Sequence, residues 1–117
     1  MTVQPEDLAV DVERRDDTVV LTAHGVLDYF HSGILRDPLD EAVQRAGALV
    51  VLDLSGVTFV DSTGLALLLT ADQAARRSGA RLRLACPAPQ LRRMLDTTNL
   101  TRRFALHDTV AAALQAE

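Results

Sequence analysis

Four consecutive residues near the middle of the chain, Asp61-Ser62-Thr63-Gly64, could present a reactive hydroxyl at the start of a helix. Asp61 can cap the helix, because its carboxylate can accept a hydrogen bond from an early helical N–H. Ser62 would then occupy the first helical position with its hydroxyl unused, whereas a cap formed by Ser62 itself would engage that hydroxyl. Gly64 has no side chain, so another backbone or a ligand can approach the first turn closely. We therefore expect a docking surface with an accessible hydroxyl.

A helix cap with no further role is the simplest interpretation of the same four residues, because capping sequences are common. Three features favour a functional site instead. A buried strand precedes the motif, a glycine lies in the first helical turn, and a second turn, Gly25-Val26-Leu27-Asp28, occurs earlier in the chain. Asp28 ends the second predicted strand, so we expect that it could lie at the same sheet edge as Ser62.

An enzyme is the next alternative, because Ser62, Asp28 and Asp61 could combine with one of the histidines, His24, His31 or His107, as nucleophile, base and orienting group. However, Ser62 lacks the G-x-S-x-G pattern of a nucleophile elbow, and no histidine occupies an obviously paired position. The glycines do not form a P-loop or a dinucleotide fingerprint, and no metal-ligand spacing occurs. We therefore expect no enzyme, no catalytic residue, no metal and no cofactor.

Composition predicts one ordinary globular domain. The 117 residues, 48% of them hydrophobic, are enough for a single domain spanning residues 1–117, with an ordered core of about residues 6–115. Aromatic residues are scarce, so Leu, Val and Ala must form the core. The formal net charge of −4 argues against nucleic acid as a partner. The single cysteine, Cys86, is expected to be buried and reduced.

The chain also lacks the signals of export or membrane insertion. Met1 to Asp7 is polar and acidic and does not resemble a signal peptide. The longest apolar run, within Leu65 to Leu69, is far shorter than the ~20 residues that cross a bilayer. We expect a soluble, cytoplasmic protein.

Strands and helices alternate along most of the chain, which predicts an α/β fold. Alternating apolar residues from Leu8 to Glu13 indicate a first strand, followed by a charged turn from Arg14 to Asp17. The remaining predicted strands are Thr18–Leu27, Leu49–Leu54, Arg81–Ala85 and Arg103–Leu106. The predicted helices are Ser62–Ser78, Pro89–Leu95 and Thr109–Gln115, and Asp108 is expected to cap the last of them. The first two strands should form an antiparallel hairpin, and strands separated by helices should be parallel.

The helix before the third strand is harder to delimit. Asp37 and Pro38 form a strong helix start, with Asp37 as cap and Pro38 at the first helical position. A helix that began at Ser32 would hold Pro38 in its second turn and lose a backbone hydrogen bond. We expect a break near Arg36-Asp37 or a short irregular turn before the main helix.

Three segments resemble one known family. Phe59 to Leu65 (FVDSTGL) is similar to the hallmark motif of STAS domains in anti-sigma factor antagonists, also called anti-anti-sigma factors. Gly25 to Asp28 resembles the turn after that family's second strand, and Met94 to Leu100 resembles its third-helix segment. The resemblance covers nearly the whole chain in the expected order. It implies the STAS fold, a mixed, mostly parallel sheet of about five strands with about four helices packed on it.

The resemblance also implies a protein-binding switch in bacterial transcription. In that family the unmodified domain binds an anti-sigma factor and so frees a sigma factor. The anti-sigma factor is also an ATP-dependent serine kinase, which phosphorylates the residue that matches Ser62 and releases the domain; a PP2C-type phosphatase then resets it. Thr63 is a second candidate acceptor. The implied partner-binding residues are Asp28, Asp61, Ser62, Thr63, Gly64 and Leu65, in a monomer or weak dimer.

The chain departs from the family pattern near the expected partner surface. His31 and Ser32 occur where a Thr or Ser often opens the first helix, and Pro38 interrupts that helix. Val26 replaces a residue that is commonly acidic. Asn99 replaces the usual glycine, although Asn tolerates the left-handed backbone conformation that this position requires.

A non-enzymatic STAS module with another task remains the competing interpretation. It could be a scaffold subunit of a stress-signalling assembly or an accessory subunit of a lipid-transport complex. A serine directly after Asp61 favours the phosphorylation switch.

Overall fold

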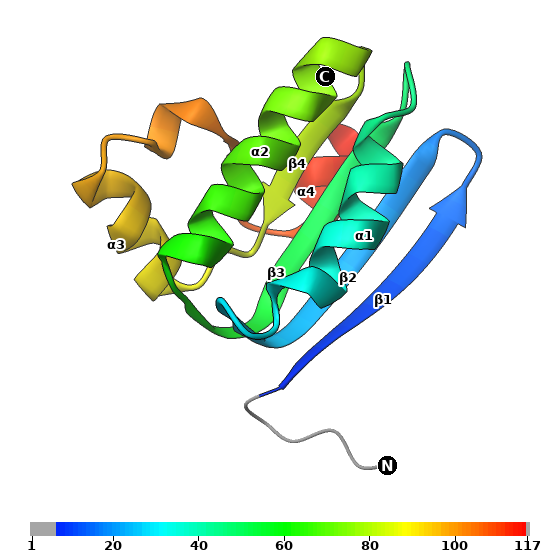
Figure 1. Ribbon diagram of the computed structural model, residues 1–117. Helices are drawn as coiled ribbons and strands as arrows, with labels where there is room; N and C mark the ends of the chain where they lie inside the picture. The colour runs from blue at the N-terminus through cyan, green and yellow to red at the C-terminus, as the bar shows by residue number, and fades with distance from the viewer. Residues whose placement is uncertain (1–6, 117) are drawn as a thin grey trace.

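A single five-stranded sheet carries helices on both faces in the computed structural model, which describes residues 7–116 (Figure 1). The strands are β1 (Leu8–Arg15), β2 (Thr18–Leu27), β3 (Leu49–Val60), β4 (Arg81–Ala85) and β5 (Ala105–His107). The helices are α1 (Ser32–Val43), α2 (Ser62–Ser78), α3 (Pro89–Thr97) and α4 (Val110–Gln115), with a short 3-10 turn at Thr101–Arg103. The strands lie in chain order, β1 antiparallel to β2 and all later neighbours parallel. The predicted mixed, mostly parallel α/β sheet is confirmed.

The sheet separates two apolar layers of unequal size. Helices α1, α2 and α3 cover one face and share the large core with it; the fully buried side chains of this core include Leu21, Leu52, Leu68 and Leu84. The short helix α4 lies on the opposite face, where Ala113 packs beside Leu49 and Val51 (Figure 1). Leu, Val and Ala supply nearly all of the buried apolar side chains, as the composition predicts.

Helix α1 is continuous from Ser32 to Val43 and is preceded by His31 at the N-cap position, so Asp37 is not its cap. The break expected near Arg36-Asp37 is wrong, and so is the alternative of an irregular turn before a helix that starts at Pro38. Pro38 lies inside the helix and removes one backbone hydrogen bond. Leu35 and Leu39, four residues apart, are both completely buried. A break between them would turn one of these side chains away from the core, so their burial outweighs the missing bond.

Strand β3 runs six residues beyond its predicted end at Leu54, because its second half continues to pair with β2 up to Leu27↔Val60. Register shifts at two points of the β2–β3 pair accommodate this extension. Strand β4 pairs with β3 only as far as Asp53↔Ala85. The end of β3 therefore has a strand neighbour on one side only.

Several smaller expectations need correction. Strand β1 extends to Arg15, because Arg14 and Arg15 pair with Val19 and Thr18, which leaves a two-residue turn. The closing helix is capped by Thr109, whose hydroxyl accepts from Ala112 N at 3.0 Å. Asp108 is not the cap, because its carboxylate accepts a hydrogen bond from Arg92 at 2.7 Å.

The last strand begins at Ala105 rather than at Arg103. Arg103 ends the 3-10 turn, and its guanidinium lies 3.2 Å from the carboxylate of Asp72, which holds it outside the sheet. Cys86, expected to be buried, is only half-buried, although desolvation and nearby Asp53 raise the pKa of its thiol. Asn99 adopts a left-handed conformation with φ of 60°, as predicted.

Candidate functional site

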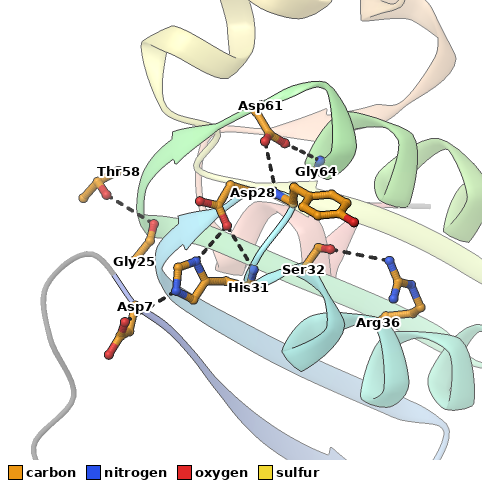
Figure 2. Close-up of polar contacts among 10 residues, drawn as sticks. Asp7, Gly25, Asp28, His31, Ser32, Arg36, Thr58, Asp61 and Gly64 are labelled. Carbon is orange, nitrogen blue, oxygen red and sulfur yellow. Dashed lines mark hydrogen bonds and ion pairs between the residues drawn. The ribbon is translucent and has the colours of Figure 1, made fainter.

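The candidate site lies where β2 and β3 end and α1 and α2 begin (Figures 1 and 2). The last pair of the two strands is Leu27↔Val60, so the residues that follow them, Asp28 and Asp61, emerge at the same sheet edge. The Asp61 carboxylate accepts a hydrogen bond from Tyr29 N at 3.1 Å and so joins the two segments. The structure therefore brings together the Asp28 turn and the Asp61-Ser62 motif, which are more than 30 residues apart.

Asp61 caps helix α2, as its side chain accepts a hydrogen bond from Gly64 N at 3.0 Å. Its backbone is extended, with φ of −101°, which is typical of an N-cap residue. Ser62 is consequently the first residue of α2, and its side chain is exposed. Within residues 7–116 its hydroxyl forms no hydrogen bond with the protein. The alternative in which Ser62 is the cap is thus excluded.

Thr63 is half-buried and faces α1 across a shallow hollow of about 190 Å³. Arg36 of α1 lines the same hollow and donates a long hydrogen bond of 3.4 Å to the hydroxyl of Ser32. The Thr63 side chain is therefore less accessible than that of Ser62. A larger hollow of about 640 Å³ lies near the β1–β2 turn, at the far end of β2 from this site.

Gly64 and Leu65 face the interior rather than solvent. A methyl group on Gly64 would lie 2.4 Å from the carbonyl oxygen of Leu27 and 3.0 Å from a methyl carbon of Val60. The backbone that approaches this glycine is therefore the end of β2 in the same chain. Leu65 is buried in the large core. These two residues can affect a partner only by setting the position of the α2 N-terminus.

His31 and two carboxylates form a polar cluster beside the motif (Figure 2). Nδ1 of His31 lies 2.7 Å from Asp28 Oδ1, and Nε2 lies 3.4 Å from Asp7 Oδ1. The hydrogen bond to Asp28 raises the pKa of His31, against a smaller opposing effect of desolvation. Desolvation alone would raise the pKa of Asp28, but hydrogen bonds from the His31 ring and backbone lower it. A positively charged imidazole is therefore favoured here.

Gln90 of α3 holds the end of β3 with two hydrogen bonds to one residue. Its side-chain oxygen accepts from Val60 N at 2.9 Å, and its side-chain nitrogen donates to Val60 O at 2.8 Å. The two bonds fix the backbone immediately before Asp61. Sequence analysis missed this contact because Gln90 lies 30 residues away and nothing in its local pattern signals it. The His31 cluster was also missed, because Asp28 and His31 precede α1 and the helical spacing rule for side-chain pairs does not apply to them.

In the part of the chain from Asp7 to Ala116, no helix is both long and apolar enough to cross a bilayer. Nor do those residues contain a group of three or more His, Cys, Asp or Glu side chains that could hold a metal ion.

Comparison with known proteins gives one consistent family. The STAS domain family matches residues 9–113. An anti-sigma F factor antagonist of Paenibacillus polymyxa is 28% identical over 109 residues, which cover 92% of this chain and 93% of that protein. The anti-sigma-B factor antagonist of Bacillus subtilis (strain 168) is 27% identical over 94 residues, covering 80% and 85% of the two chains.

A solved structure extends the agreement to three dimensions. The crystal structure of an anti-sigma factor antagonist from Mycobacterium paratuberculosis superimposes with a TM-score of 0.79 at 26% identity, and the match covers 97% of this chain and 96% of the other. The region matched by the family, residues 9–113, includes β1 except for Leu8, the other four strands, three complete helices and the motif at the start of α2. The chain therefore belongs to the STAS domain family.

Proposed function

We propose that this chain is an anti-sigma factor antagonist controlled by phosphorylation of Ser62. The unmodified chain binds an anti-sigma factor and so frees a sigma factor, and the same anti-sigma factor acts as a serine kinase that releases the chain. The names of the relatives from Paenibacillus polymyxa and Bacillus subtilis support the antagonist function. The observation that carries the choice of residue is the Ser62 side chain, exposed at the first position of α2 while Asp61 performs the capping.

The proposed chemistry is transfer of the γ-phosphoryl group of ATP to the Ser62 hydroxyl oxygen, with loss of the hydroxyl proton and departure of ADP. The acceptor oxygen is accessible, because Ser62 is exposed and its hydroxyl has no hydrogen-bond partner within residues 7–116 to displace. Thr63 is the secondary acceptor, since it is half-buried against α1. A PP2C-type phosphatase would remove the phosphate and reset the chain.

Phosphorylation should release the partner without unfolding the domain. A negative charge at a helix N-terminus is favourable by ~0.3–1 kcal/mol, so the modified domain remains folded. In the interface, a phosphate that becomes buried without a counter-charge costs roughly 2–5 kcal/mol, which is enough to lose most binding. Asp61 adds a second negative charge next to the phosphate. In this proposal the chain is a cytoplasmic monomer or weak dimer and performs no catalysis itself.

Incubation with candidate kinase-type anti-sigma factors and ATP, followed by mass spectrometry, tests the proposal. We expect one added phosphate at Ser62, none in Ser62→Ala, and normal phosphorylation of Ser55→Ala, a matched control with an exposed serine on β3. Ser62→Ala should bind the anti-sigma factor permanently, and Ser62→Asp should bind poorly. A partner that binds but never modifies Ser62 or Thr63 would show that the switch is wrong.

Co-purification addresses the competing functions. Recovery of a transporter ATPase or a multisubunit stress-signalling scaffold, with no anti-sigma factor, would replace the proposed function by an accessory or scaffold role.

A further inference from the structure

Two aromatic side chains project into solvent beside the candidate site. Tyr29 is 70% exposed and Phe30 is 85% exposed, more than any other large hydrophobic side chain in residues 7–116. Their rings touch edge to face, with centroids 5.3 Å apart and planes at 83°. Ile34, half-exposed in the first turn of α1, lies four residues after Phe30 in the chain. Exposed apolar groups gathered in this way mark interaction surfaces, and aromatic residues are frequent in interface hot spots.

The backbone that carries this pair is held at several points. Tyr29 N donates to Asp61 Oδ2 at 3.1 Å, and His31 N donates to Asp28 Oδ1 at 3.0 Å. Ser32 N also donates to the carbonyl oxygen of Asp28 at 2.9 Å. The segment is therefore ordered before any partner arrives, which reduces the conformational entropy lost on binding.

We propose that Tyr29 and Phe30, called here the aromatic anchor, insert into an apolar pocket of the anti-sigma factor and supply much of the affinity. The proposal rests on the proposed function, because it takes the anti-sigma factor as the partner. Continuity with the phosphorylation site identifies this occupant. Asp61 immediately precedes Ser62 and also bonds the anchor backbone, so a kinase that reaches the Ser62 hydroxyl docks directly beside the anchor.

The hydrogen bonds around the anchor are compatible with an apolar pocket in the partner. The Asp28 carboxylate is paired with His31, and both oxygens of Asp61 accept hydrogen bonds from this chain, one from Gly64 N and one from Tyr29 N. An apolar pocket that covers the anchor would therefore leave none of these carboxylates without a hydrogen-bond partner. A phosphate on Ser62 would then find no counter-charge in the pocket, in agreement with release on phosphorylation.

A second copy of this chain fits the anchor less well. Each copy carries a formal net charge of −4, so two copies repel each other as they approach. Two aromatic side chains and Ile34 also supply far less than the roughly 1,200 Å² of total buried surface typical of a stable interface. A protein with a complementary pocket is thus the better occupant.

Titration calorimetry with the anti-sigma factor that the unmodified chain captures tests the anchor. Tyr29→Ser and Phe30→Ser should each weaken binding at least about tenfold, as expected for hot-spot residues. The matched control is Leu114→Ser on α4, which is exposed on the opposite face of the sheet and should bind within about twofold of the wild type. Circular dichroism should show all three variants folded, because the replaced side chains are exposed.

Each outcome is decisive. Binding of both aromatic variants within twofold of wild type overturns the anchor while leaving the proposed function intact. Binding that depends on the anchor, with no phosphorylation of Ser62 or Thr63, supports the anchor and rejects the switch. If sedimentation shows that wild type self-associates and Phe30→Ser does not, the occupant is a second copy and the proposal is wrong. A wild type that binds no anti-sigma factor rejects both proposals.

Discussion

Replacing Gly64 by alanine probes the close approach of α2 to the end of β2. The new methyl group would lie 2.4 Å from the Leu27 carbonyl oxygen and 2.9 Å from Leu27 Cγ. Relief to an ordinary contact of about 3.5 Å requires the helix start or the strand end to move by about 1 Å. The obstructing atom belongs to the backbone, so it cannot rotate away. Overpacking of this kind costs about 3 kcal/mol, and the better helix propensity of alanine recovers at most about 1 kcal/mol.

We therefore expect Gly64→Ala to lower the free energy of unfolding by about 2 kcal/mol and the melting temperature by about 8 °C. Gly33→Ala is the matched control, because Gly33 also lies in the first turn of a helix and a methyl group there would meet only the Arg36 side chain, at 3.9 Å. That variant should be as stable as wild type or up to about 1 kcal/mol more stable. Urea unfolding followed by circular dichroism measures both. Equal stabilities of the two variants would refute the packing argument.

Two further predictions concern the contacts around the site. The pKa of His31 is raised in the folded state, so protonated His31 stabilises the fold. This contribution to the free energy of unfolding should be fully present below about pH 6.5 and lost as the pH rises through the folded pKa. His31→Gln should remove that pH dependence in urea unfolding, and an unchanged profile would contradict it. Gln90→Ala removes two hydrogen bonds to Val60, so it should lower the free energy of unfolding by about 1–3 kcal/mol and speed hydrogen exchange at Val60 N–H. Gln73→Ala, an exposed control on α2, should have neither effect. Slow exchange at Val60 in the Gln90 variant would show that another group holds the strand.

Elements with strong local signals were predictable to the residue. The bounds of β2, β4 and α2 agree with the sequence prediction. Helix α2 begins after the Asp61 cap and ends at Gly79, which adopts φ of 84°. Both signals act within a few residues, so they can be read without knowledge of the remaining chain.

Errors arose where distant contacts outweighed local preference. Pro38 favours a helix start, but the burial of Leu35 and Leu39 against the sheet keeps α1 continuous. The extension of β3 from Ser55 to Val60 depends on pairing with β2, a strand that begins 31 residues before β3. No local pattern in Ser55 to Val60 predicts this pairing.

In the candidate site, too, features set by adjacent residues were predictable, and contacts between distant segments were not. The capping role of Asp61 and the free position of Ser62 follow from adjacent residues, and the structure shows both. Two other contacts join segments about 30 residues apart. Asp61 accepts a second hydrogen bond from Tyr29 N, and Gln90 forms hydrogen bonds with Val60. Such contacts depend on the sheet register, which the sequence does not specify residue by residue.

The hold of Gln90 on Val60 has a consequence for association between chains. Beyond Asp53, β3 has no β4 residue beside it, so the backbone groups on that side would be open to strand addition by another molecule. The side-chain amide of Gln90 takes both the donor and the acceptor of Val60, as a further strand would. One glutamine thus occupies the backbone donor and acceptor at Val60 that strand addition would use, directly beside the candidate site.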